Sequence, residues 1–152
     1  MSIIHYVISG TVATMIGSNI LHMIISSTID SIYNSVSFLK NGTESHKDII
    51  KIKKDVQSLD ITVKLKMIQN LLNTLPETDI SKIVEDGLGD IIYKIKNLVD
   101  LIDLDIEKHK RKWLNSYRSI NLSDKMDELK VLVKILDSRC SMLILINQKN
   151  FS

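Results

Sequence analysis

Residues 123–147 read SDKMDELKVLVKILDSRCSMLILIN, and this stretch decides the fold class. Apolar side chains recur in it every three or four positions, at Met126, Leu129, Val133, Leu136, Cys140 and Leu143. That spacing places all of them on one face of an α-helix, as is typical of a helix in a bundle. Ser123 is suited to cap the start of the helix, and Asp124 follows in the first turn, where a carboxylate favours the helix dipole. We therefore expect a long amphipathic helix over about 123–147.

Three segments upstream show the same helical period, over about 3–39, 44–75 and 77–117. Within 44–75 the apolar pattern changes phase, which we interpret as a stutter that alters the winding of one continuous helix. Asn41-Gly42-Thr43 and Pro76 separate the segments. Only 5 Gly and 1 Pro occur in the 152 residues, too few for the turns of a many-stranded sheet. The sequence predicts an all-α fold, a single-domain antiparallel bundle of four long helices.

The third segment contains two closely spaced glycines and a long apolar stripe. Gly87 and Gly89 are expected either to kink the helix or to mark its true start, since glycine weakens a helix interior. The stripe continues through Ile106 and His109 to Trp113. We therefore interpret His109 as a packed core side chain and not as a metal ligand.

No pattern of residues indicates catalysis. Asp100, Asp103 and Glu107 share the side of the third segment that faces away from its apolar stripe, so we expect a solvated face and not an acid–base pair. The 4 histidines are scattered singly, and the single Cys140 excludes an intramolecular disulfide and a cysteine-based zinc site. We expect no catalytic residue, no metal and no cofactor. Cys140 is interpreted as a buried thiol, as suits a reducing intracellular compartment.

Residues 1–29 contain no charged side chain, although 25% of the whole chain is charged. Gly10, Ala13 and Gly17 fall on one face of the expected helix, where another backbone can come close. His22 lies on a stripe of hydroxyl side chains and is expected to hydrogen-bond across the bundle. The span is long enough to cross a bilayer, which takes about 20 residues, but many hydroxyls interrupt it. A buried bundle helix, a membrane-inserting helix and a surface helix all remain open.

A basic cluster lies near the end of the third segment, where residues 107–119 carry five basic side chains against one acid. Its candidate lipid-binding residues are Lys108, Lys110, Arg111, Lys112, Trp113 and Arg118. Such a cluster can dock on anionic lipid head groups, or it can merely complement the negative end of a helix dipole. Nucleic acid is a weaker alternative, because no aromatic-bearing strand is expected that would stack bases.

The order of these features resembles the helical-bundle domains of the HeLo and mixed-lineage-kinase-like class. The resemblance rests on ISGTVA at 8–13, IKKDVQSL at 52–59 and LDSRC at 136–140. Members of that class induce cell death by attacking membranes. The resemblance therefore implies a membrane-permeabilising bundle.

The chain is also similar to small uncharacterised helical proteins encoded by large DNA viruses of protists. VISGTV at 7–12, SIY at 31–33, and HKRKW at 109–113 with Arg118 following carry this similarity. It implies a viral origin and no particular chemistry.

These observations favour a non-catalytic helical-bundle protein that associates with a membrane or acts as a scaffold. Its expected partner is an anionic membrane surface or another helical protein, and nucleic acid is not expected. Two alternatives are a membrane-permeabilising cell-death bundle and a soluble homo-oligomeric interaction module that pairs through Gly10, Ala13 and Gly17.

Overall fold

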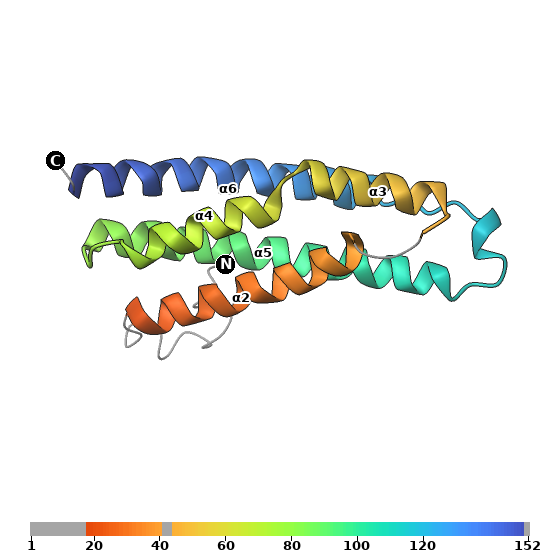
Figure 1. Ribbon diagram of the computed structural model, residues 1–152, viewed down its shortest axis with the longest axis horizontal. Coiled ribbons are helices and arrows are strands. Elements are labelled where there is room, and N and C mark those ends of the chain that lie inside the picture. The colour runs from red at the N-terminus through yellow and green to blue at the C-terminus, as the bar shows by residue number, and fades with distance from the viewer. Residues whose placement is uncertain (1–17, 41–43, 151–152) are drawn as a thin grey trace.

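Figure 1 shows the computed structural model, which describes residues 18–40 and 44–150. The helices are α2 (Ser18–Lys40), α3 (Lys47–Ser58), α4 (Ile61–Asn73), α5 (Asp79–Lys110) and α6 (Ser123–Asn150), with a 3-10 turn η2 (Asn115–Tyr117) before α6. No strand occurs in the described residues. The predicted all-α helical bundle is confirmed.

The closest packing in the bundle joins α2 to α5, and these two helices run in the same direction. Near their starts, His22 of α2 contacts Glu85 of α5. Further along, Ser35 Oγ donates a hydrogen bond to Asp100 Oδ1 at 2.8 Å. The partners advance together along both helices, so the pair is parallel, whereas α3 and α4, which lie between them in the sequence, run the opposite way.

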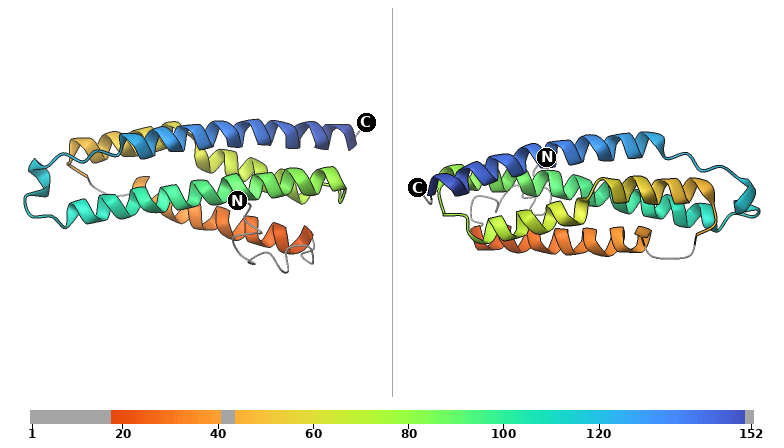
Figure 2. Two further views of the ribbon diagram at one scale, coloured as in Figure 1. Left: turned by 180° about the vertical axis from the view of Figure 1, so that it is seen from behind. Right: turned by 45° about the horizontal axis from the view of Figure 1, so that its top comes forward.

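Two further sets of contacts show which of the other helices pack against each other. α6 packs antiparallel on α5, where the Arg139 guanidinium donates to the carbonyl oxygen of Gly87. α4 lies against α2 and α6 and runs parallel to α6, with Lys64 Nζ 3.0 Å from Asp137 Oδ2. The short connection at 74–78 therefore carries the chain across the bundle before α5 begins, and Figure 2 shows the helices from behind and from above.

Aliphatic side chains from all the helices fill the core. On α2, Ile25, Ile29 and Ile32 are fully buried at helical spacing. On α6, the predicted heptad is confirmed, because all of its members are buried: Met126, Leu129, Val133, Leu136, Cys140 and Leu143. The described part of the charge-free N-terminal span therefore supplies core side chains.

The second predicted helix is interrupted, which corrects the expectation of one continuous helix over 44–75. Asp60, between α3 and α4, has a left-handed backbone with φ 54°. Val56 and Ile61 are both buried, yet five residues of continuous helix would turn them roughly 140° apart. The break at Asp60 re-aims α4 so that both apolar sets face the core, and Val63 of the earlier phase is left about half exposed.

The third predicted helix starts and ends inside its expected bounds of 77–117. Thr78 and Ser81 form a capping box, with Thr78 Oγ1 accepting from Ser81 N and Ser81 Oγ accepting from Thr78 N. α5 then runs unbroken through Gly87 and Gly89, so neither glycine is the start of the helix. It ends at Lys110, not at Tyr117.

A glycine–alanine comparison tests the break at Asp60. In a left-handed position, Asp60→Gly should give a free energy of unfolding about 1 kcal/mol higher than Asp60→Ala, because a Cβ is strained there. At the exposed mid-helix Lys54 the order should reverse, with alanine about 1 kcal/mol better than glycine. Urea denaturation measures both pairs. Alanine being better at both positions would instead indicate one continuous helix.

Candidate functional site

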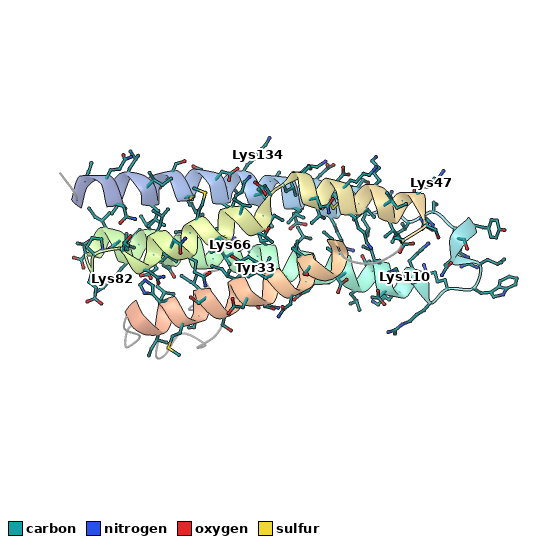
Figure 3. All side chains as sticks on the ribbon, in the orientation of Figure 1. Tyr33, Lys47, Lys66, Lys82, Lys110 and Lys134 are labelled. Carbon is teal, nitrogen blue, oxygen red and sulfur yellow. The ribbon has the colours of Figure 1, made fainter. Side chains whose placement is uncertain are left out.

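The predicted basic cluster lies at one end of the bundle, where α5 ends and α3 begins; Figure 3 labels Lys110 and Lys47 there. We call residues 108–118 the tip. Residues 44–46, directly before α3, lie at this end beside the connection after α5, where His46 Nε2 contacts the carbonyl oxygen of Arg118. The tip is therefore supported by a segment that lies far from it in the sequence.

Two histidines anchor the tip. His109 is buried on α5, and its Nε2 lies 3.2 Å from the carbonyl oxygen of Asn115. The His46 ring meets the His109 ring edge-on, with centroids 5.0 Å apart. His46 Nδ1 accepts from the backbone N–H of Asp48, so its Nε2 carries the proton that is donated to the carbonyl oxygen of Arg118 at 2.7 Å. The prediction of a packed His109 agrees with this geometry.

The chain turns sharply between these anchors. Arg111 caps the end of α5, and Asn115 Nδ2 donates back to the carbonyl oxygen of Lys110 at 2.5 Å. Leu114 has a left-handed backbone with φ 56°. A leucine in that region is strained, so the turn depends on its surroundings and not on local preference.

The turn points two aromatic side chains into solvent. Trp113 is 78% exposed and Tyr117 is 86% exposed. The expectation that the apolar stripe of α5 continues to Trp113 is therefore wrong, because the helix ends at Lys110 and the stripe ends at His109. Apolar rings held this far out of the protein are unusual, since large aromatics are mostly buried on average.

The basic side chains of the cluster divide into two groups. Lys108, Arg111, Lys112 and Arg118 are exposed, and no acid among the described residues forms an ion pair with them. Lys110 is half-buried, with its Nζ 3.4 Å from Glu44 Oε2 and 3.6 Å from Glu107 Oε1. Lys110 is therefore a structural residue, whereas the others present their charge to solvent beside Trp113.

Glu44 helps to hold this base of the tip. Its carboxylate accepts from the backbone N–H of His46 at 3.0 Å. Burial alone would raise the pKa of Glu44, but this hydrogen bond and the nearby Lys110 outweigh it and lower the pKa below its ordinary value. Glu44 thus stays ionised and neutralises Lys110, which leaves the net positive charge on the exposed side chains.

Of the predicted helix-packing residues, Gly10, Ala13 and Gly17 lie outside the described residues. His22 is described, and its Nε2 contacts Glu85 Oε1 across the α2–α5 interface. The predicted hydrogen bond of His22 across the bundle stays a prediction. Glu85 is only 2% exposed. It lies on the core stripe between Ser81 and Leu88, and a carboxylate at a core position was the sequence signal that the prediction missed.

The His22–Glu85 pair is suited to share one proton. Burial raises the pKa of Glu85 to about 7, and the charge of Glu77 adds to the rise. Burial lowers the pKa of His22, opposed by Glu77. Both shifts favour the neutral forms, in which a carboxyl O–H can donate to the unprotonated imidazole nitrogen.

The acidic stripe on α5 is less solvated than predicted. Asp100 accepts from Ser35 and pairs with Lys96 Nζ at 2.6 Å, and both Asp103 and Glu107 are half-buried. Burial raises the pKa of Asp103, and the charges of Glu107 and Asp100 add to the rise. The stripe faces toward α2, where Ser35 lies.

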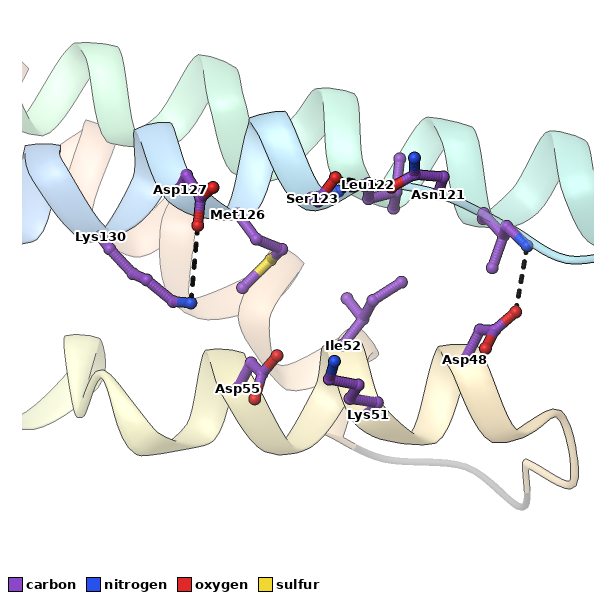
Figure 4. A pocket seen from close by; sticks show the side chains of 11 residues that line it. Asp48, Lys51, Ile52, Asp55, Asn121, Leu122, Ser123, Met126, Asp127 and Lys130 are labelled. Carbon is purple, nitrogen blue, oxygen red and sulfur yellow. Dashed lines mark hydrogen bonds and ion pairs between the residues drawn. The ribbon is translucent and has the colours of Figure 1, made fainter.

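A shallow pocket of about 250 Å³ lies between α3 and the start of α6 (Figure 4). Asp48, Asp55 and Asp127 line it together with Lys51 and Lys130, so charges of both signs face it. Asp48 Oδ2 accepts from the backbone N–H of Ile120. In the described residues, no group of three or more His, Cys, Asp or Glu side chains is placed to hold a metal ion.

No family model matches the chain, and no curated protein or solved structure matches it significantly. Across residues 18–40 and 44–150, no helix combines the length and the apolarity needed to cross a membrane. Within the described residues, the tip combines exposed cations with exposed aromatic rings on one surface.

The raised pKa of buried Glu85 predicts a pH-dependent stability. A folded pKa above the ordinary 4.5 means that the contribution of Glu85 is full below pH 4.5 and is lost as the pH rises through about 7. Glu85→Gln keeps the shape of the side chain but cannot ionise. As the pH rises from acidic to mildly basic, the parent protein should lose stability that the variant keeps. The unfolding free energy of the variant minus that of the parent should therefore increase by about 1–3 kcal/mol.

Urea denaturation across this pH range measures the difference, and His22 is present in both proteins. Glu128→Gln makes the same chemical change on the exposed face of α6 and should show no such trend. A difference between Glu85→Gln and the parent protein that does not change with pH would show that the pKa of Glu85 is the same in the folded and unfolded states, and the prediction would fail.

Proposed function

We propose that this protein is a non-catalytic, peripheral membrane-binding bundle that docks on anionic lipid through its tip. One observation carries the proposal: Trp113 and Tyr117 project into solvent in the middle of exposed cations that no described acid neutralises. Trp and Tyr are enriched at membrane interfaces, where the ring enters the apolar boundary and the polar atom stays hydrated.

The cations around these rings supply the attraction to lipid. A basic residue close to an anionic membrane contributes about 1 kcal/mol, and Lys108, Arg111, Lys112 and Arg118 are exposed together on the tip. Half-exposed Leu114 adds apolar surface at the same place. The combination of charge and rings lets weak contacts act jointly on one surface.

Complementing the helix dipole explains only part of the cluster. Lys108 and Lys110 lie in the last turn of α5, where cations are favoured. Lys112 and Arg118 lie beyond the end of α5, so the helix dipole does not account for their positions. Stacking of nucleic-acid bases is disfavoured as well, because no sheet platform exists in the described residues.

Vesicle binding tests the proposal. The full-length protein should sediment with phosphatidylserine-containing vesicles at low salt and not with phosphatidylcholine vesicles, because the attraction requires anionic lipid. Arg111→Ala/Lys112→Ala should weaken binding about thirtyfold, at about 1 kcal/mol for each charge. Trp113→Ala should weaken it separately. Trp113 is the only tryptophan, so the tryptophan fluorescence of the parent protein should shift to the blue when it binds these vesicles.

The matched control removes two charges elsewhere. Lys66→Ala/Lys134→Ala makes the same change on exposed side chains in the middle of the bundle, as Figure 3 shows. This variant should bind vesicles like the parent protein. Equal loss in both double variants would mean that net charge, and not the tip, drives binding, and the proposal would fail.

A truncation separates the tip from the N-terminal segment. Removal of 1–29 would delete the core side chains Leu21, Ile25 and Ile29, so its effect on binding could not be told from unfolding. Removal of 1–17 leaves α2 whole. Tip-driven docking predicts that this shorter protein still binds anionic vesicles, whereas a complete loss would assign the lipid contact to 1–17.

A further inference from the structure

The helix α6 carries apolar side chains on two opposite faces. Its inner face holds the buried heptad that packs in the core. On its outer face Val131, Ile135, Met142 and Leu145 are exposed by 55%, 36%, 50% and 58%. Other helices expose large apolar side chains in pairs, such as Val63 with Met67 on α4 and Leu101 with Leu104 on α5, whereas α6 exposes four along one row.

The outer residues follow a heptad of their own. With Ser138 they form a row at 131, 135, 138, 142 and 145, alternating steps of four and three. We call this row the outer seam. It is about 21 Å long at 1.5 Å per residue. Scattered exposed apolar residues are ordinary, but a regular seam of this kind is the pattern by which one helix packs lengthwise on another.

The charges that flank the outer seam select the direction of a partner helix. Continuing the row by one step in each direction reaches Glu128 at the start and Lys149 at the end. A second α6 lying antiparallel would place Glu128 beside Lys149 of the other copy. A parallel arrangement would place each charge beside its own kind, which is unfavourable.

The spacing of the outer seam also suits a two-fold axis. When the axis passes at Ser138, Val131 faces Leu145 of the second copy, and Ile135 faces Met142 to within one residue. Ser138 is small and exposed, so two helices can approach closely at the axis. The same patch then serves both copies, as two-fold association requires.

We propose that two copies of this chain associate antiparallel through the outer seam of α6. A single seam of this length buries less than a standard interface, so the dimer is weak and its population rises with protein concentration. The arrangement places the two tips at opposite ends of the pair. Resting on the proposed function, the dimer would therefore bridge two lipid surfaces.

Sedimentation equilibrium of the full chain without lipid tests the association. The parent protein should shift from monomer to dimer with rising concentration, and Ile135→Glu/Met142→Glu should raise the dimer dissociation constant at least about tenfold. The matched control, Val63→Glu/Met67→Glu on α4, changes side chains that are 49% and 47% exposed and should dimerise like the parent. A parent protein that stays monomeric, or equal loss in the control, overturns the proposal.

Disulfide cross-linking tests the direction of the two helices in a Cys140→Ser background, which removes the free thiol. Ser138→Cys should link to a second copy of itself. Glu128→Cys should link to Lys149→Cys in a mixture but not to itself. Self-linking of Glu128→Cys would show a parallel pair and would overturn the antiparallel arrangement.

Light scattering measures the clustering of vesicles, and this assay distinguishes failure of the dimer proposal from failure of the tip proposal. The outer-seam variant should bind anionic vesicles without clustering them, whereas the tip variant should dimerise without binding them. If the outer-seam variant loses vesicle binding while the parent protein is monomeric, the seam contacts lipid and not a second copy. The dimer is measured without lipid, so failure of tip docking leaves it standing.

Discussion

The parallel packing of α2 on α5 is the constraint on which the rest of the structure depends. Burial of aliphatic side chains such as Ile25 and Ile29 drives this packing but gives it little directional preference. Two polar contacts set the register, from His22 to Glu85 and from Ser35 to Asp100. Since α3 and α4 lie between these helices in sequence, the chain must return along the bundle and cross it at 74–78 before α5 begins.

The tip is a direct consequence of that arrangement. α5 ends at the end of the bundle where α3 begins, so residues 44–46 lie beside the turn that follows α5. His46 from one segment and His109 from the other pack edge-on and fix the turn between α5 and α6. The two histidine rings support the turn, and Trp113 projects from it into solvent. An exposed ring in this position is suited to enter a membrane interface.

The two proposals use different physical properties of one rigid rod. The tip concentrates charge and aromatic rings at an end, where they can contact a flat surface. The outer seam spreads apolar contact along the side of α6, where only another elongated helix can match it.

The sequence by itself determined the all-α class, the inner face of α6 and the place of the basic cluster, because helical periodicity and charge order are local properties. It did not determine the break at Asp60, since only the position of neighbouring helices decides that Val56 and Ile61 must both face the core. It missed Glu85 for the same reason, because a carboxylate at a core position needs its partner His22 from another helix. The exposure of Trp113 was likewise decided by tertiary structure: anchors at His46, His109 and Asn115 end α5 earlier than its apolar stripe predicts.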